Sequence, residues 1–202
     1  MRIGLFGGSF NPVHLGHIAV ARAALDRLGL DKVVFIPSRH PPLKGAEGLM
    51  PADLRLALVR AALTDEPAME CNAIEIEREG PSFTVDTVEA LLPTFPAGAE
   101  LYFLLGADCL ARLPRWKGIE RLHALLRFAI FPRGGEAGQA AADPRLVHVP
   151  MPESPLSSTL VRARLAEGAA IGDIVPAPVA ALLADRWPPL GAAPPAGDLI
   201  PS

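Results

Sequence analysis

This chain of 202 residues has little cysteine, no long apolar run and no excess of positive charge, and each of these shortages excludes a class of protein. The two cysteines, Cys71 and Cys109, make no disulfide framework and lack the spacing of a metal site. The longest apolar stretch, near residues 174–184, is too short to cross a bilayer, and Gly7 and Gly8 interrupt the apolar start before it can form a secretory signal. A formal net charge of −3 lacks the excess of positive charge that is typical of nucleic-acid-binding proteins. We therefore expect a cytoplasmic protein that binds neither nucleic acid nor a membrane.

Two common nucleotide-binding motifs are absent as well. A P-loop ends in glycine followed by lysine, and no glycine of this chain precedes a lysine. A dinucleotide fingerprint needs Gly-x-Gly-x-x-Gly, whereas Gly4, Gly7 and Gly8 have a different spacing.

The segment from Gly7 to His17 nevertheless has the features of a phosphate-binding loop. It follows an apolar run, Ile3–Phe6, that predicts a buried strand, and it precedes Ile18–Leu25, which predicts a helix. This arrangement places backbone N–H groups and the positive end of a helix against an anion. His14 and His17 would share one face of the helix start, and Gly16 would let a ligand approach the backbone. The alternative is a loop with two surface histidines.

Apolar runs alternate with helical patterns along the rest of the chain. Further strands are expected at Lys32–Pro37, Glu70–Glu77, Leu101–Leu105, Phe128–Phe131 and Leu146–Val149. Further helices are expected at Asp53–Leu63, Thr84–Leu92, Ser157–Leu165 and Pro178–Trp187. The alternation predicts a Rossmann-like, doubly wound α/β fold, with a mostly parallel sheet and helices on both faces.

Polar residues follow several of the expected strands. They lie at Ser38–Lys44 after the second strand, at Gly106–Asp108 after the central strand, and at Arg133 after the next one. Because ligands of such sheets bind beyond the carboxyl ends of the strands, these loops are expected to converge with residues 7–17 on one site.

A second phosphate site is expected at the start of the late helix. Ser157, Ser158 and Thr159 begin it, and Arg162 lies three or four positions further on, so its guanidinium can fold back over the helix end. Hydroxyls, a helix N-terminus and a fixed cation suit the outer phosphates of a triphosphate. The alternative is ordinary helix capping, for which one hydroxyl residue is enough.

These segments resemble a known superfamily. Residues 7–17 are similar to the Gly-x-Phe-Asp-Pro-x-His-x-Gly-His signature of nucleotidyltransferases, with Asn11 where aspartate is usual, and Leu156–Arg162 resembles their second motif, Ile-Ser-Ser-Thr-x-Ile-Arg. Four more segments occur in the order found in bacterial nicotinate-nucleotide adenylyltransferases: Ile36–Lys44, Pro81–Thr87, Gly106–Leu110 and Leu113–Trp116. The resemblance runs from about Arg2 to Leu183.

The resemblance implies transfer of AMP from ATP to nicotinic acid mononucleotide, giving deamido-NAD and pyrophosphate by in-line attack without a covalent intermediate. His14, His17 and Arg162 are the implied catalytic residues, and Mg²⁺ is expected to arrive with ATP. The implied ATP-binding residues are Gly8, Ser9, Phe10, His14, His17, Gly106, Asp108, Arg133, Ser158, Thr159 and Arg162. The implied mononucleotide-binding residues are Ser38, Lys44, Thr84, Asp108 and Trp116, of which Trp116 would stack on the pyridine ring.

Each implied role has a plainer alternative. Trp116 can be a core residue, Lys44 a solvated side chain and Asp108 a helix cap. Leu43 stands where the family often has histidine, and Lys117 where an aromatic residue often follows the tryptophan. A lysine close to the pyridine carboxylate would favour nicotinate over nicotinamide.

Two other functions remain open: a phosphopantetheine adenylyltransferase, and a nucleotide-binding module without turnover. The first usually has Thr-x-Gly-His where this chain has His14-Leu15-Gly16-His17, and it lacks the block around Trp116. We expect residues 1–187 to form a single nucleotidyltransferase domain, on which the helices from about residue 157 pack. Residues 188–202, rich in proline, are expected to be a tail without a core role. Homo-oligomers are possible.

Overall fold

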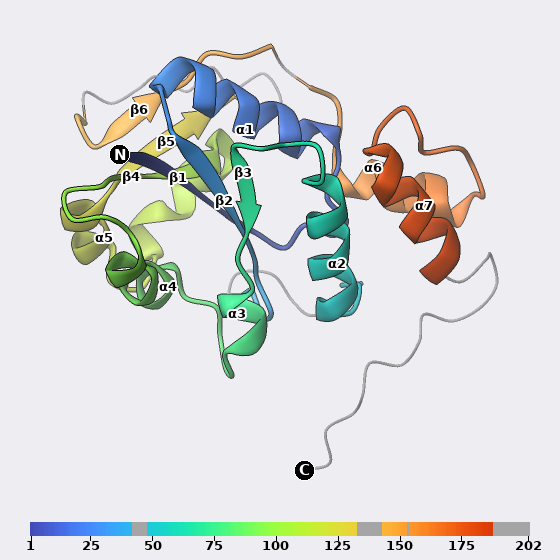
Figure 1. Cartoon of the computed structure of the whole chain (residues 1–202), viewed down its shortest axis with the longest axis horizontal. Coiled ribbons are helices and arrows are strands. Elements are labelled where there is room, and N and C mark those ends of the chain that lie inside the picture. The colour runs from blue at the N-terminus through green and yellow to red at the C-terminus, as the bar shows by residue number, and fades with distance from the viewer. Residues whose placement is uncertain (42–47, 133–142, 153, 188–202) are drawn as a thin grey trace.

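Six strands form one parallel sheet in the computed structural model, which describes residues 1–41, 48–132, 143–152 and 154–187. They are β1 (Arg2–Gly8), β2 (Lys32–Pro37), β3 (Met69–Cys71), β4 (Glu100–Gly106), β5 (Arg127–Phe131) and β6 (Leu146–His148). Their order is β3-β2-β1-β4-β5-β6, and every neighbouring pair is parallel (Figure 1). The strand order reverses between β1 and β4, where doubly wound folds bind their ligands.

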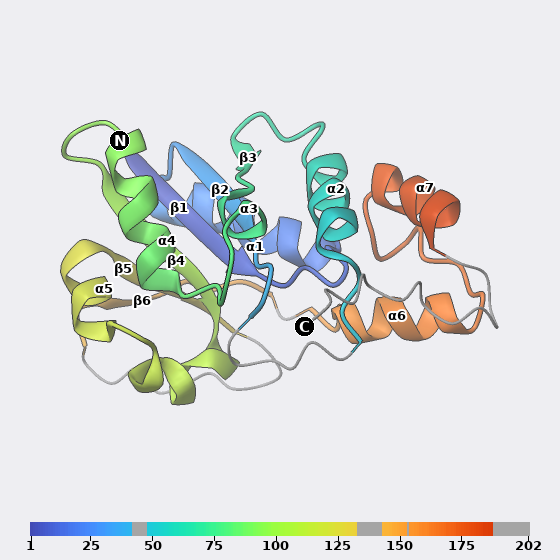
Figure 2. The same ribbon diagram turned by 90° about the horizontal axis from the view of Figure 1, so that it is seen from below.

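Helices cover both faces of the sheet (Figures 1 and 2). The α-helices are α1 (Leu15–Leu28), α2 (Ala52–Ala62), α3 (Ile74–Glu77), α4 (Thr84–Leu91), α5 (Ile119–Leu125), α6 (Ser158–Ala166) and α7 (Ala177–Arg186). Two 3₁₀ segments, η1 (Leu92–Thr94) and η2 (Ala107–Arg115), follow α4 and β4. The predicted doubly wound, Rossmann-like α/β fold is confirmed.

One expected strand is wrong over most of its length. Of Glu70–Glu77, only Glu70 and Cys71 belong to β3, and residues from Ile74 onward form α3. The Asn72 side chain accepts a hydrogen bond from the backbone N–H of Ile74 at 2.9 Å, and this local turn starts the helix. The weak alternation of the sequence therefore coincided with a short helix.

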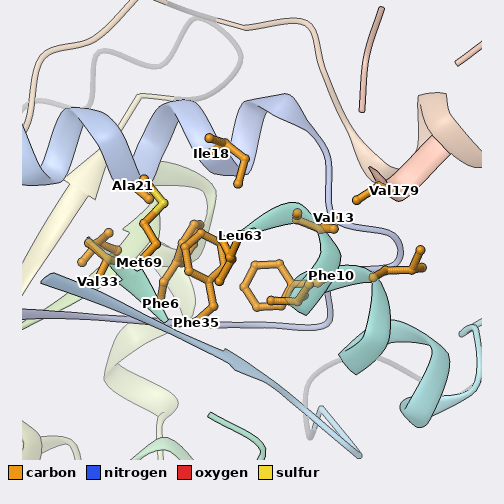
Figure 3. Packing of buried hydrophobic residues seen from close by; sticks show 14 of the residues in the cluster. Phe6, Phe10, Val13, Ile18, Ala21, Val33, Phe35, Leu63, Met69 and Val179 are labelled. Carbon is orange, nitrogen blue, oxygen red and sulfur yellow. The ribbon is translucent and has the colours of Figure 1, made fainter. Parts of the chain in front are cut away.

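The core consists of two hydrophobic clusters, one on each face of the sheet. Ile3 and Leu5 of β1 point to the cluster that α4 and α5 cover, whereas Phe6 points to the cluster that α1 and α2 cover. This is the side-chain alternation of a strand buried on both faces. Figure 3 shows Phe6, Phe10 and Phe35 packed beneath α1, with ring centroids 5.2–5.5 Å apart.

The late helices share the same core as the first half of the chain. Val161 of α6 and Val179 and Leu183 of α7 belong to the cluster beneath α1 and α2, and α7 packs on α2 (Figure 2). None of the helices in the described part of the chain is long and apolar enough to span a membrane. The expected tail at 188–202 lies outside the described residues.

Candidate active site

The loop between β1 and α1 uses its two histidines to start the helix. His14 is the N-cap, and its Nδ1 accepts the backbone N–H of Gly16 at 3.1 Å. His17 reaches back, and its Nδ1 accepts the backbone N–H of His14 at 3.2 Å. The pair thus makes a reciprocal capping box from imidazoles, with ring centroids 3.8 Å apart. The cap explains why α1 begins at Leu15, three residues before the predicted start.

The capping bonds also fix which imidazole nitrogen carries the proton. A ring nitrogen that accepts a hydrogen bond bears no proton, so the neutral rings of His14 and His17 carry theirs on Nε2. Each histidine therefore has an N–H on the ring edge opposite its cap bond.

Gly16 makes room for the His14 ring. A Cβ at this position would lie 2.9 Å from Nδ1 and Cε1 of His14, which is closer than Cβ atoms approach other heavy atoms in proteins. The close approach that glycine permits here is therefore that of the capping imidazole, and Gly16 also lines the cavity described below.

The N-terminus of α6 is tied directly to this loop. Ser157 is the N-cap, and its Oγ accepts the backbone N–H of Leu160 at 3.1 Å. The Ser158 hydroxyl instead donates to the Pro12 carbonyl at 3.0 Å, and Nη1 of Arg162 donates to the Asn11 carbonyl at 2.8 Å. Ser157 alone therefore caps the helix, and Ser158 and Arg162 place the second predicted phosphate site beside the first.

Asn11, the departure from the usual aspartate, is 5% exposed and joins the first loop to the segment before α2. Its Nδ2 donates to the Gly48 carbonyl at 2.9 Å, and its Oδ1 accepts the Met50 backbone N–H at 2.8 Å. An aspartate could make only the second of these bonds, because a carboxylate has no N–H to donate.

The loop after β2 is held against the loop after β1. Ser38 is 6% exposed, its backbone N–H donates to the Gly8 carbonyl at 2.9 Å, and its hydroxyl lies 3.3 Å from the same oxygen. The hydroxyl of Ser82 accepts the backbone N–H of Arg39 at 3.2 Å. Arg55 of α2, 1% exposed, donates to carbonyl groups of both loops, and burial lowers its pKa to about 10, so it remains protonated at neutral pH.

Trp116 lies at the other end of the site, directly after η2. Its ring packs edge to face on Phe103, at 5.7 Å, and on Phe128, at 6.1 Å. It is only half-buried and lines the cavity, so it serves as a core residue and as a wall of the site.

Lys117 is placed by partners of its own. Its Nζ lies 2.9 Å and 3.0 Å from the two carboxylate oxygens of Asp86 and 4.7 Å from the centroid of the Phe83 ring. The ammonium therefore sits at the start of α4 as half of an exposed ion pair, at the rim of the cavity.

A single cavity of about 770 Å³ joins these parts. It is lined by every predicted site residue within the described segments, namely Gly8, Ser9, Phe10, His14, His17, Ser38, Thr84, Gly106, Asp108, Trp116, Ser158, Thr159 and Arg162. Two predicted residues, Lys44 and Arg133, lie outside the described residues, as does Leu43. The sequence therefore predicted which residues gather, although their roles remain predictions.

The cavity also contains charged residues that the sequence did not single out. Arg112 and Arg115 project from η2, where a repeat of three residues per turn places them in one row. Glu75 of α3 is 7% exposed and accepts a 2.7 Å hydrogen bond from the Thr87 hydroxyl. Burial raises the pKa of the Glu75 carboxyl. Arg115 lies in the segment Leu113–Trp116 that carries the resemblance, although no role was expected of it, and nothing in the pattern pointed to Arg112 or Glu75.

Within the residues that the structure describes, no group of three or more His, Cys, Asp and Glu side chains is arranged to hold a metal ion. The histidines and the helix N-termini are donors of hydrogen bonds, which suits phosphate oxygens rather than a cation.

Comparison with known proteins agrees with this geometry. The family model described as cytidylyltransferase-like matches residues 5–164, and the chain belongs to this class of nucleotidyltransferases. A relative from Shouchella clausii is 42% identical over 92% of this chain and 95% of its own length. One from Gemmatimonas aurantiaca is 40% identical over 91% of this chain and 90% of its own length. Both are assigned as nicotinate-nucleotide adenylyltransferases, and the chain is a member of that family.

Solved structures show the same fold. Nicotinic acid mononucleotide adenylyltransferase from Plasmodium falciparum, solved with NaAD, superposes with a TM-score of 0.71 at 19% identity, over 91% of this chain and 95% of its own. The same protein solved with APC gives a TM-score of 0.68 at 18% identity, over 91% and 94% of the two chains. At this identity the likeness supports the fold, and the family rests on the sequence relatives.

Proposed function

We propose that this protein transfers AMP from ATP to nicotinic acid mononucleotide, releasing pyrophosphate and forming deamido-NAD. One observation carries the proposal: a single cavity has two helix N-termini with cationic and hydroxyl side chains at one end and Trp116 at the other. A nucleoside triphosphate and a flat aromatic nucleotide are the two substrates that such ends suit. The relatives of this family carry the same activity in their names.

The triphosphate would lie between α1 and α6. The Nε2–H groups of His14 and His17 would donate to the α- and β-phosphates, with the N-terminus of α1 behind them. Ser158, Thr159 and Arg162 would hold the β- and γ-phosphates. The Arg162 guanidinium is already fixed by the Asn11 carbonyl, so little side-chain freedom remains to be lost when ATP binds.

The pyridine ring of the mononucleotide would stack on Trp116. Its carboxylate would meet the N-terminus of α4, where Phe83 and Thr84 line the cavity and no side chain caps the helix. Trp116 and the N-terminus of α4 lie close together, because Lys117 follows Trp116 in the chain and binds Asp86 of α4. Its charge is largely matched by Asp86 in open solvent, so the backbone N–H groups of α4 would supply more of the preference for the acid.

The chemistry needs no protein nucleophile and no general base. A phosphate monoester is mostly dianionic at neutral pH, since its second pKa is about 6. An oxygen of the 5′-phosphate attacks the α-phosphorus of ATP in line, a P–O bond forms, and the bond to pyrophosphate breaks with its electron pair going to the leaving group. The protein contributes alignment and donors for the charge on the transferring and leaving phosphates. Mg²⁺, carried on the phosphate oxygens, would neutralise part of that charge.

The test is pyrophosphate release from ATP and Mg²⁺ with nicotinic acid mononucleotide, nicotinamide mononucleotide and phosphopantetheine in parallel. A strong preference for the nicotinic acid form is expected. Release only with phosphopantetheine would refute the substrate and leave the triphosphate site intact, whereas ATP binding without release in any arm would favour a non-catalytic module. The Arg162→Ala variant is the matched control, because it removes one ligand of the triphosphate and leaves the Trp116 end of the cavity unchanged.

A further inference from the structure

A buried arginine lies beside the cavity, and within the described segments all its hydrogen-bond partners are backbone carbonyl groups. Arg55 lies on the inward face of α2, in one stripe with Leu58, Val59 and Ala62. A guanidinium at a core position is costly unless its N–H groups are satisfied. Here backbone carbonyl oxygens accept from Nε, Nη1 and Nη2, and the Asp53 carboxylate adds an electrostatic attraction.

The carbonyl groups belong to three different segments. Nη1 donates to Ser9 in the loop after β1 and to Ser38 in the loop after β2, both at 2.7 Å. Nε donates to Met50 before α2 at 2.9 Å, and Nη2 lies 3.3 Å from the Arg39 carbonyl. In Figure 1 the loop from β1 to α1 runs beside α2, the helix that contains Arg55.

We propose that Arg55 is a positioning residue that fixes the distance between the loop after β1, where the triphosphate would bind, and the loop after β2, where Ser38 is expected to contact the mononucleotide. The inference rests on the proposed function, which requires the two substrates to meet in line. The loop after β1 would bind the triphosphate, and Ser38 in the loop after β2 is expected to contact the mononucleotide. Loosening the link between the loops therefore leaves most contacts of each substrate present and misaligns the two substrates. Reaction depends on alignment much more steeply than binding does, and an error of about 1 Å can cost about 100-fold in rate.

A lysine cannot replace this fork. Its three N–H groups radiate from one atom, whereas the guanidinium spreads five donors over a plane that spans Met50, Ser9 and Ser38. Nη1 alone contacts both loops, so Arg55→Lys keeps a cation and a long stem, but one ammonium nitrogen cannot hold the two serine carbonyls together with those of Met50 and Arg39. The common link between the three segments is therefore lost. Arg60→Lys, at an exposed position of the same helix, is the matched control.

The first experiment measures steady-state kinetics of Arg55→Lys with both substrates varied. We expect kcat to fall about 10–100-fold while each KM changes less than about threefold, and Arg60→Lys to resemble the wild type. A kcat within twofold of the control would overturn the proposal, and so would a loss confined to one KM.

The second experiment is native-state hydrogen exchange, which does not depend on the identity of the substrates. The Ser38 amide donates to Gly8 across the two loops, and the Met50 amide donates to the Asn11 side chain. In Arg55→Lys these amides should exchange faster, while the amides of Leu122 in α5 and Phe128 in β5 keep their wild-type protection. Equal acceleration everywhere would mean a general stabilising role and would refute the positioning role.

The two experiments separate the two proposals. If the wild type transfers no AMP to nicotinic acid mononucleotide, the proposed function fails. The amide hydrogen exchange of the Arg55 variant then tests by itself whether Arg55 links the two loops. If the wild type is active and the variant loses neither kcat nor loop protection, only the positioning role fails. Arg55→Met serves as the second variant, since it keeps the apolar stem and removes all the donors.

Discussion

Substitutions of His17 can separate the stability that this residue gives to α1 from its contribution to turnover. His17 caps the helix through Nδ1 and would donate to phosphate through Nε2. In His17→Ala the capping bond and the phosphate donor are lost together. In His17→Glu the capping bond returns, because a carboxylate at the third helical position is the usual partner in a capping box, but a negative charge replaces the donor.

The expected magnitudes differ enough to be separated. Loss of the cap costs about 1 kcal/mol, which lowers the Tm of a domain of this size by about 2–4 °C. Loss of a donor to a transferring phosphate costs roughly 10²–10³-fold in kcat. The loss of folding stability cannot cause the fall in kcat, since a domain stable by about 5–15 kcal/mol remains almost fully folded after losing about 1 kcal/mol.

The assays are thermal unfolding and pyrophosphate release on the same preparations. We expect His17→Ala to lose both Tm and turnover, and His17→Glu to recover the wild-type Tm while its turnover stays at or below that of the alanine variant. His148→Ala, at an exposed histidine of β6, should match the wild type in both. If turnover returned with Tm in His17→Glu, His17 would be a cap and nothing more.

Three further predictions concern other parts of the cavity. Trp116→Ala should raise the KM for the mononucleotide about tenfold and leave the KM for ATP within twofold, whereas an equal rise in both would mean that Trp116 is structural. Arg162→Ala should raise the KM for ATP about 10–100-fold, with mononucleotide binding unchanged by calorimetry; weaker mononucleotide binding would contradict its placement at the triphosphate. Burial raises the pKa of Glu75 in the folded state above its value in the unfolded chain. The folded state therefore loses stability as the pH rises from the unfolded pKa to the folded pKa of this carboxyl. Glu75→Gln should therefore have a higher Tm than the wild type at pH 8 and a similar Tm at pH 4, and a Tm difference that does not depend on pH would refute this reasoning.

The sequence predicted the parts of the site that depend on neighbours in the chain. A glycine-rich turn between a buried strand and a helix is a local arrangement, so the phosphate loop and its histidines could be recognised before any fold was known. The alternation of strands and helices was equally sufficient for the sheet, because parallel strands need crossovers. The same local reasoning failed at Ile74–Glu77, where the chain leaves the sheet through a turn at Asn72 and forms a short helix.

Tertiary structure alone decided how the separate motifs meet. Ser158 contacts Pro12 across 146 residues, and Arg162 contacts Asn11 across 151, which no pattern along the chain can show. Arg55 has the sequence context of a solvated helix residue, although it occupies a core position of the stripe on α2. A buried guanidinium is stable only where carbonyl groups from several loops surround it, and those loops come together only when the whole sheet has formed. The sequence thus determined which chemical groups the site contains, and the fold determined the distances at which they act.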